Sequence, residues 1–132
     1  LGLLEGLTKV YGVPILMGQT LAKEIPEYAQ LEVDQVRVVG REAPERIYAL
    51  LGRPVMAGDK DFQAMKAAFA DMLAAYRGQQ WTAAETALVR VKEAGSVFGI
   101  EKLAGLFAER IARYRASPPP ADWDGVYQAE EK

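Results

Sequence analysis

The feature that most constrains the fold is a change of residue type near the middle of the chain. Up to residue 51 short helical patterns mix with β-branched runs, whereas residues 59–116 are rich in Ala, Leu, Glu, Lys and Arg, which favour helices. The junction GRPVMAGD at 52–59 holds the Gly and Pro residues typical of a boundary. We therefore expect an α+β protein. Its expected parts are a mixed part at 1–52, a linker at 53–58, a helical tail at 59–117 and an extended Pro-rich segment at 118–132.

The first 26 residues predict a helix, a strand and a second helix. Apolar residues recur at helical spacing from residue 3 until Gly12, a residue suited to end a helix. The apolar run at 14–17 indicates a short buried strand. Thr20 is suited to cap a second short helix, which Pro26 ends.

A β-hairpin is expected next. Apolar and polar residues alternate from 31 to 38, and the alternation slips by one residue at Gln35, as a bulge would require. Residues 39–44 contain Gly and Pro and predict a turn, and 46–51 form the second strand.

Three helices are expected in the tail. Asp59 is suited to cap the first, Thr82 begins a capping box for the second, and the third runs from 99 to 115. The aromatic and small residues at 76–88 resemble a tetratricopeptide unit. A single unit rarely makes a binding groove, so we favour a structural cap and keep partner binding as the alternative. Near the end, Trp123 is expected to dock on the protein.

Composition excludes several classes of function. The chain has no Cys, no His and no Asn, and half of its residues are hydrophobic. Structural zinc, disulfides and histidine-assisted nucleophiles are therefore not expected. The net charge of −2 gives no general attraction to nucleic acid, and no apolar run is long enough to span a bilayer. The first residues do not resemble a signal peptide.

Two kinds of candidate site remain. Asp59 with Asp61, and Asp122 with Asp124, are paired carboxylates of the kind that could hold a divalent cation, although a helix cap and solvated turns explain them better. At the hairpin turn, a glycine precedes Arg41, whose guanidinium could clamp a phosphate or could be a solvated turn residue.

Three runs together resemble a known family. They are LEGLTKVYGVPI at 4–15, VDQVRVVGREAPERIY at 33–48 and PPPADWDGVY at 118–127. The first two resemble the second half of a class III adenylate/guanylate cyclase catalytic domain, and the last resembles the ending of bacterial members with a short helical tail. The resemblance implies the C-terminal half of a ferredoxin-like cyclase domain (helix, strand, helix, β-hairpin), followed by a three-helix tail.

The resemblance also implies a chemistry. In that family a head-to-tail dimer binds ATP or GTP with two divalent metals, Mg²⁺ or Mn²⁺, and in-line displacement releases pyrophosphate. Arg41 falls where the turn's second Lys contacts the nucleotide phosphates, whereas Val39 replaces the first Lys. Leu3 falls where the family has its transition-state Arg, and no metal ligand of the family matches a residue of this chain.

We therefore expect part of an intracellular signalling protein that makes cyclic AMP from ATP. The metal-binding Asp residues and the transition-state Asn are expected upstream, so the chain alone should be inactive, with no catalytic residue and no metal ligand of its own. A homodimer, a cytoplasmic location and no contact with membrane or nucleic acid are expected, whether or not the parent protein is tethered to a membrane. An unpaired strand edge should make the isolated chain associate. The alternative is a non-catalytic interaction module that uses the helical tail.

Overall fold

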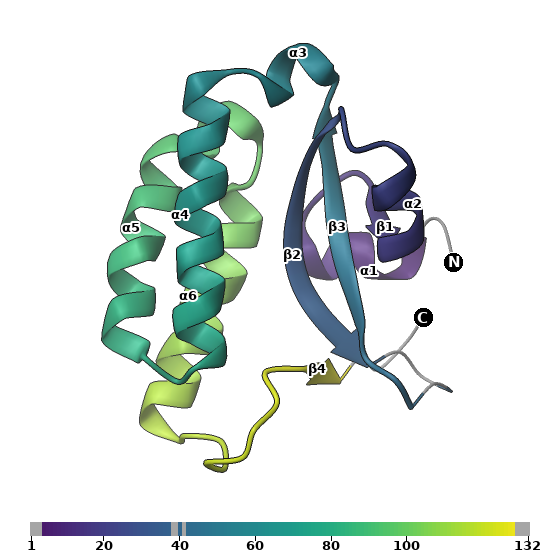
Figure 1. The fold of residues 1–132 in the computed structure, drawn as a ribbon. Coiled ribbons are helices and arrows are strands. Elements are labelled where there is room, and N and C mark those ends of the chain that lie inside the picture. Colours follow the sequence, from purple (N-terminus) through teal and green to yellow (C-terminus); the bar gives the residue numbers. More distant parts are fainter. Residues whose placement is uncertain (1–3, 38–39, 41, 129–132) are drawn as a thin grey trace.

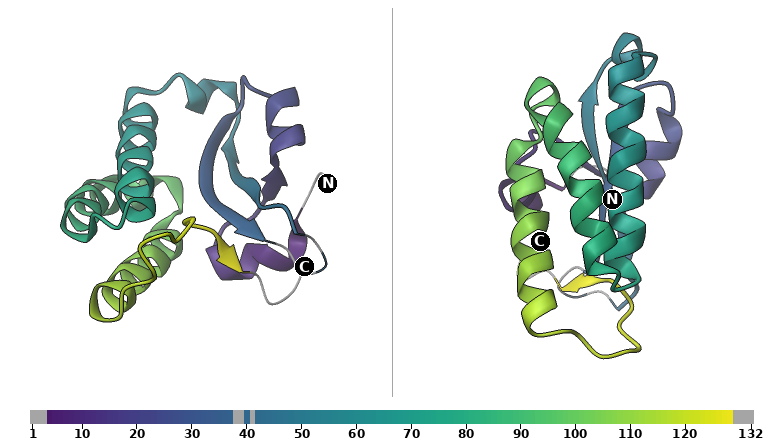
Figure 2. Two further views of the ribbon diagram at one scale, coloured as in Figure 1. Left: turned by 60° about the horizontal axis from the view of Figure 1, so that its bottom comes forward. Right: turned by 90° about the vertical axis from the view of Figure 1, so that its left-hand side faces the viewer.

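The computed structural model describes residues 4–37, 40 and 42–128, and it confirms the α+β class. Three long helices lie side by side next to a four-stranded sheet (Figure 1), and two further views show the same separation (Figure 2). In chain order the elements are α1 (Glu5–Tyr11), β1 (Leu16–Gly18), α2 (Gln19–Glu24), β2 (Ala29–Arg37), β3 (Glu45–Gly52), α3 (Pro54–Ala57), α4 (Lys60–Arg77), α5 (Trp81–Phe98), α6 (Glu101–Ala116) and β4 (Tyr127–Gln128).

The sheet has the order β1-β3-β2-β4. β3 is antiparallel to both β1 and β2, which confirms the predicted hairpin. Parallel pairing adds the two-residue strand β4 to the other edge of β2, with Val36 opposite Tyr127. The order therefore brings the end of the chain next to the hairpin.

The bulge predicted at Gln35 lies one or two residues earlier. The pairing of β2 with β3 shifts between Glu32 and Asp34, so that Val33 is the extra residue. Both Val33 and Asp34 are fully buried, because the bulge changes which faces of the strand these neighbouring side chains occupy. The position of the bulge thus decides that a carboxylate enters the interior.

Two helix ends form at the residues that the sequence predicted. Gly12 adopts φ 67° at the end of α1, a conformation that favours glycine. Asp59 caps α4 as predicted, since its Oδ2 accepts a hydrogen bond from the N–H of Phe62 at 3.0 Å. The caps predicted at Thr20 and Thr82 are wrong. Helix α2 begins at Gln19 and helix α5 at Trp81, so each threonine lies inside its helix.

The predicted linker contains a helical turn of its own, and the hydrophobic core continues across it. Helix α3 lies within 53–58 and has Pro54 at its first turn. One buried cluster includes Leu31 and Val36 of β2 together with Phe69 of α4 and Phe107 of α6. The sheet and the helical tail therefore share a single core.

The last described segment packs against the rest of the protein, as expected. The ring of Trp123 lies 5.3 Å from that of Tyr76 and 5.2 Å from that of Tyr114, measured between centroids. Gly125 adopts φ 74°, and a Cβ atom there would lie 2.9 Å from the Cγ of Arg77. The chain passes over α4 in close contact before it joins the sheet as β4.

Candidate functional site

The turn of the hairpin was the predicted phosphate site, and two of its residues, Val39 and Arg41, lie outside the described part of the chain. Leu3 and the acidic end at 129–132 also lie outside it. The base of the turn is described. The guanidinium of Arg37 donates from Nε to the carbonyl oxygen of Glu42 at 2.9 Å. It thereby bridges the two ends of the turn.

The same Arg37 connects the turn to the C-terminal segment. Its Nη2 lies 3.3 Å from Oδ2 of Asp124, and Oδ1 of Asp124 accepts a hydrogen bond from the N–H of Val126 at 3.0 Å. This backbone hydrogen bond, and next Arg37, hold the pKa of Asp124 below its ordinary value. Asp124 is thus a turn residue, as the simpler interpretation predicted.

The other paired carboxylates also serve local structure or face solvent. Asp59 caps α4, whereas Asp61 and Asp122 are exposed. Among the residues that the structure describes, no group of three or more acidic side chains could hold a metal ion.

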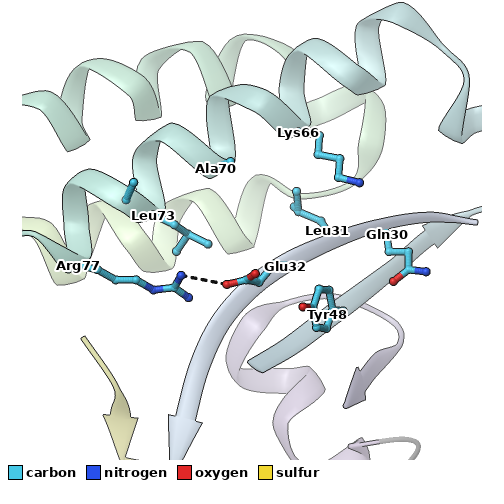
Figure 3. A pocket seen from close by; sticks show the side chains of 9 residues that line it. Gln30, Leu31, Glu32, Tyr48, Lys66, Ala70, Leu73 and Arg77 are labelled. Carbon is cyan, nitrogen blue, oxygen red and sulfur yellow. Dashed lines mark ion pairs between the residues drawn. The ribbon is translucent and has the colours of Figure 1, made fainter. Parts of the chain in front are cut away.

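A pocket of about 330 Å³ lies between the sheet and α4, and it is shown in Figure 3. Its walls combine apolar and charged side chains from β2, β3 and α4. They are Gln30, Leu31, Glu32, Tyr48, Lys66, Ala70, Leu73, Ala74 and Arg77. No motif in the sequence indicated this pocket, because its lining comes from three separate elements.

Opposite charges meet at one end of this pocket. Nη1 of Arg77 lies 2.9 Å from Oε2 of Glu32, and Arg46 approaches Oε1 of the same carboxylate at 3.4 Å. Burial, and next the charge of Glu32, raise the pKa of Tyr48 above its ordinary value. Lys66 lies at the other end of the pocket and points toward the sheet (Figure 3). These groups could bind a small polar molecule through hydrogen bonds, and none of them is a nucleophile activated by a neighbouring base.

A second polar cluster lies inside the core. Oδ2 of Asp34 accepts a hydrogen bond from the hydroxyl of Tyr11 at 2.6 Å and one from Nη1 of Arg110 at 2.7 Å. Asp34 and Arg110 are 0% and 3% exposed. The cluster joins α1, β2 and α6, and the ring of Tyr127 in β4 lies 4.1 Å from the guanidinium carbon.

Burial and charge act together on this cluster. Burial, and next the charge of Asp34, raise the pKa of the Tyr11 hydroxyl well above its ordinary value. Burial alone would lower the pKa of Arg110, but the charge and hydrogen bond of Asp34, together with Tyr11 and Tyr76, outweigh it and raise that pKa. Since the carboxylate is enclosed by its partners, this is a structural ion pair rather than a substrate site. The alternation of β2 did not predict this ion pair, because it places Asp34 among the polar positions of the strand. The bulge moves Asp34 to the interior.

Comparison with known proteins adds no relative. No family model matches the chain, and neither a curated protein nor a solved structure matches it. No helix in the described ranges is long and apolar enough to cross a membrane. The proposed function therefore rests on the fold and on the sequence motifs of this chain.

Proposed function

We propose that this chain is the C-terminal part of a class III adenylate cyclase catalytic domain, followed by a helical tail. The parent protein would convert ATP to cyclic AMP and pyrophosphate in intracellular signalling. The observation that carries the proposal is the order of elements at the start of the chain. Helix α1, strand β1, helix α2 and the β2–β3 hairpin follow one another in the order that the resemblance implies.

The C-terminal segment supports the same proposal. The runs at 33–48 and 118–127 resemble the family separately, although about 70 residues lie between them. In the fold they meet, because Val36 pairs with Tyr127 and Arg37 contacts Asp124. Two resembling segments that also pack together are better explained by a shared origin than by two chance similarities.

The proposal assigns this chain a limited chemical role. Arg41 would contact the nucleotide phosphates, where its fixed positive charge can stabilise the charge that develops on the phosphoryl oxygens. The Mg²⁺ or Mn²⁺ ions, their ligands and a second copy of the domain would belong to the parent protein. The purified chain by itself is therefore expected to form no cyclic AMP.

The decisive test is the gene sequence upstream of residue 1. We expect an open reading frame that continues through an Asp-bearing strand and a Gly-Asp-x-x-Asn run. A natural start codon near residue 1 would contradict the proposal and favour the non-catalytic interaction module. This test requires no assumption about the activity of the chain alone.

An assay then tests the chemistry. The chain incubated with ATP and Mn²⁺ should give no cyclic AMP above background, whereas the product of the longer reading frame should give clear turnover. In that product, Arg41→Ala should raise the KM for ATP, and Arg113→Ala, an exposed arginine on α6, should leave it unchanged. Equal effects of the two substitutions would contradict a phosphate contact for Arg41.

A further inference from the structure

A groove at one end of the helical tail is a candidate surface for self-association. It lies between α4 and α5 and has a volume of about 460 Å³. Its floor contains Met65 and Ala68 of α4 and Ala94 and Phe98 of α5. A second hollow, formed around α3, shares Phe98 with the groove. The two hollows are therefore neighbours on either side of Phe98.

The rim of this region exposes apolar side chains. Val55 of α3 is 90% exposed and Val97 of α5 is 77% exposed, more than any other large hydrophobic residue in the described part of the chain. Val97 lines the groove and Val55 lines the neighbouring hollow. Figure 1 shows α3 at the end of the bundle where α4 begins. A projecting valine thus lies directly beside a recess with an apolar floor, an arrangement suited to association.

The charges around the groove and around the α3 turn are opposite. Asp61 and Glu93 line the groove, are exposed, and form no ion pair with any described residue. Arg90, the remaining charged residue of the lining, is paired with Asp71 at 3.2 Å. Arg53 comes two residues before Val55 and is likewise exposed and unpaired among the described residues. The projection is therefore basic and the recess is acidic.

We propose that a second copy of this chain occupies the groove. In a two-fold dimer the α3 turn of each copy enters the groove of the other. The dimer therefore contains two identical contacts between an α3 turn and a groove. Val55 would pack between Met65 and Phe98, and Arg53 would face Asp61 and Glu93. One chain carries both the projection and the recess side by side, which makes a second copy the fitting occupant. This inference does not rest on the proposed cyclase function.

The test is the mass of the whole chain in solution over a range of concentrations, by sedimentation equilibrium. The wild type should form a dimer, and Val55→Asp or Val97→Asp should raise its dissociation constant at least about tenfold, because a carboxylate would have to be buried in an apolar contact. Val89→Asp is the matched control. Val89 is also an exposed valine of α5, at 56%, but it does not line the groove, so this variant should dimerise like the wild type.

Charge reversal tests the orientation. Arg53→Glu should weaken the dimer, and combining it with Asp61→Lys should restore part of the affinity. Circular dichroism of each variant shows whether it is folded. A folded wild type that stays monomeric at every concentration would overturn the proposal. So would a dimer that Val55→Asp leaves intact, because it would indicate association elsewhere, for example at the β1 end of the sheet.

Discussion

Removing the guanidinium from the buried cluster should be the most damaging single change at the boundary between sheet and tail. In Arg110→Met the apolar length of the side chain is largely kept, but Asp34 loses the one cationic partner that it has among the described residues, while remaining enclosed. Leaving one charge of a buried pair without its partner typically destabilises a protein by about 3–5 kcal/mol. A domain of ordinary stability has about 5–15 kcal/mol in total, so this loss would remove a large fraction of it.

The assay is urea denaturation followed by circular dichroism and tryptophan fluorescence. Arg113→Met on the same helix is the control, because Arg113 pairs with Glu109 at the surface and its side chain is 62% exposed. Loss of that exposed pair should change the free energy of unfolding by less than about 0.5 kcal/mol.

A double variant tests the physical reason. In Asp34→Asn with Arg110→Met the buried charge is gone, so a large part of the lost stability should return. If the free energy of unfolding of Arg110→Met lies within about 1 kcal/mol of the wild-type value, the burial of Asp34 does not depend on Arg110. If the double variant is no better than the single one, the loss comes from packing rather than charge.

Three further outcomes are expected. The pKa values of Tyr11 and Tyr76 are raised by burial above the ordinary 10.0, so the folded state keeps both protons when the unfolded chain begins to release them. The stability that these tyrosines contribute is present below pH 10, and above it the free energy of unfolding should fall by about 1.4 kcal/mol per pH unit for each tyrosine. Denaturation at a series of pH values would show this fall, and a flat profile would contradict the burial. Gly125→Ala should lower the free energy of unfolding by about 1–3 kcal/mol, since Gly125 has φ 74° and a Cβ would meet Arg77 at 2.9 Å; an unchanged thermal midpoint would show that the segment adapts freely. Asp59→Ala should cost about 1 kcal/mol through loss of the α4 cap, whereas Asp59→Ser should retain most of it in the same measurement.

The core suggests why the two halves belong together. Asp34 lies in β2 and Arg110 in α6, on opposite sides of the predicted linker, and neither can be buried without the other. Tyr127 then covers Arg110 at this boundary, and Trp123 packs on Tyr76 of α4. The helical tail thus shares one core with the mixed part of the chain and is not a separate appendage.

Features that depend on near neighbours along the chain could be predicted from the sequence. The helical stripes, the hairpin and the cap at Asp59 were predictable because each rests on periodicity or on a hydrogen bond spanning a few residues. The end of α1 at Gly12 belongs with them, since a left-handed conformation strongly favours glycine.

The positions at which polar groups meet depend on how the helices and strands pack. The bulge at Val33 turned Asp34 inward, and Arg110 reaches it from 76 positions along the chain. The Glu32–Arg77 pair in the pocket and the parallel pairing of β4 with β2 likewise join distant segments. Local propensity carries no information about such contacts, because they form only when helices and strands pack and the desolvation of each charge must be offset by a partner from another element.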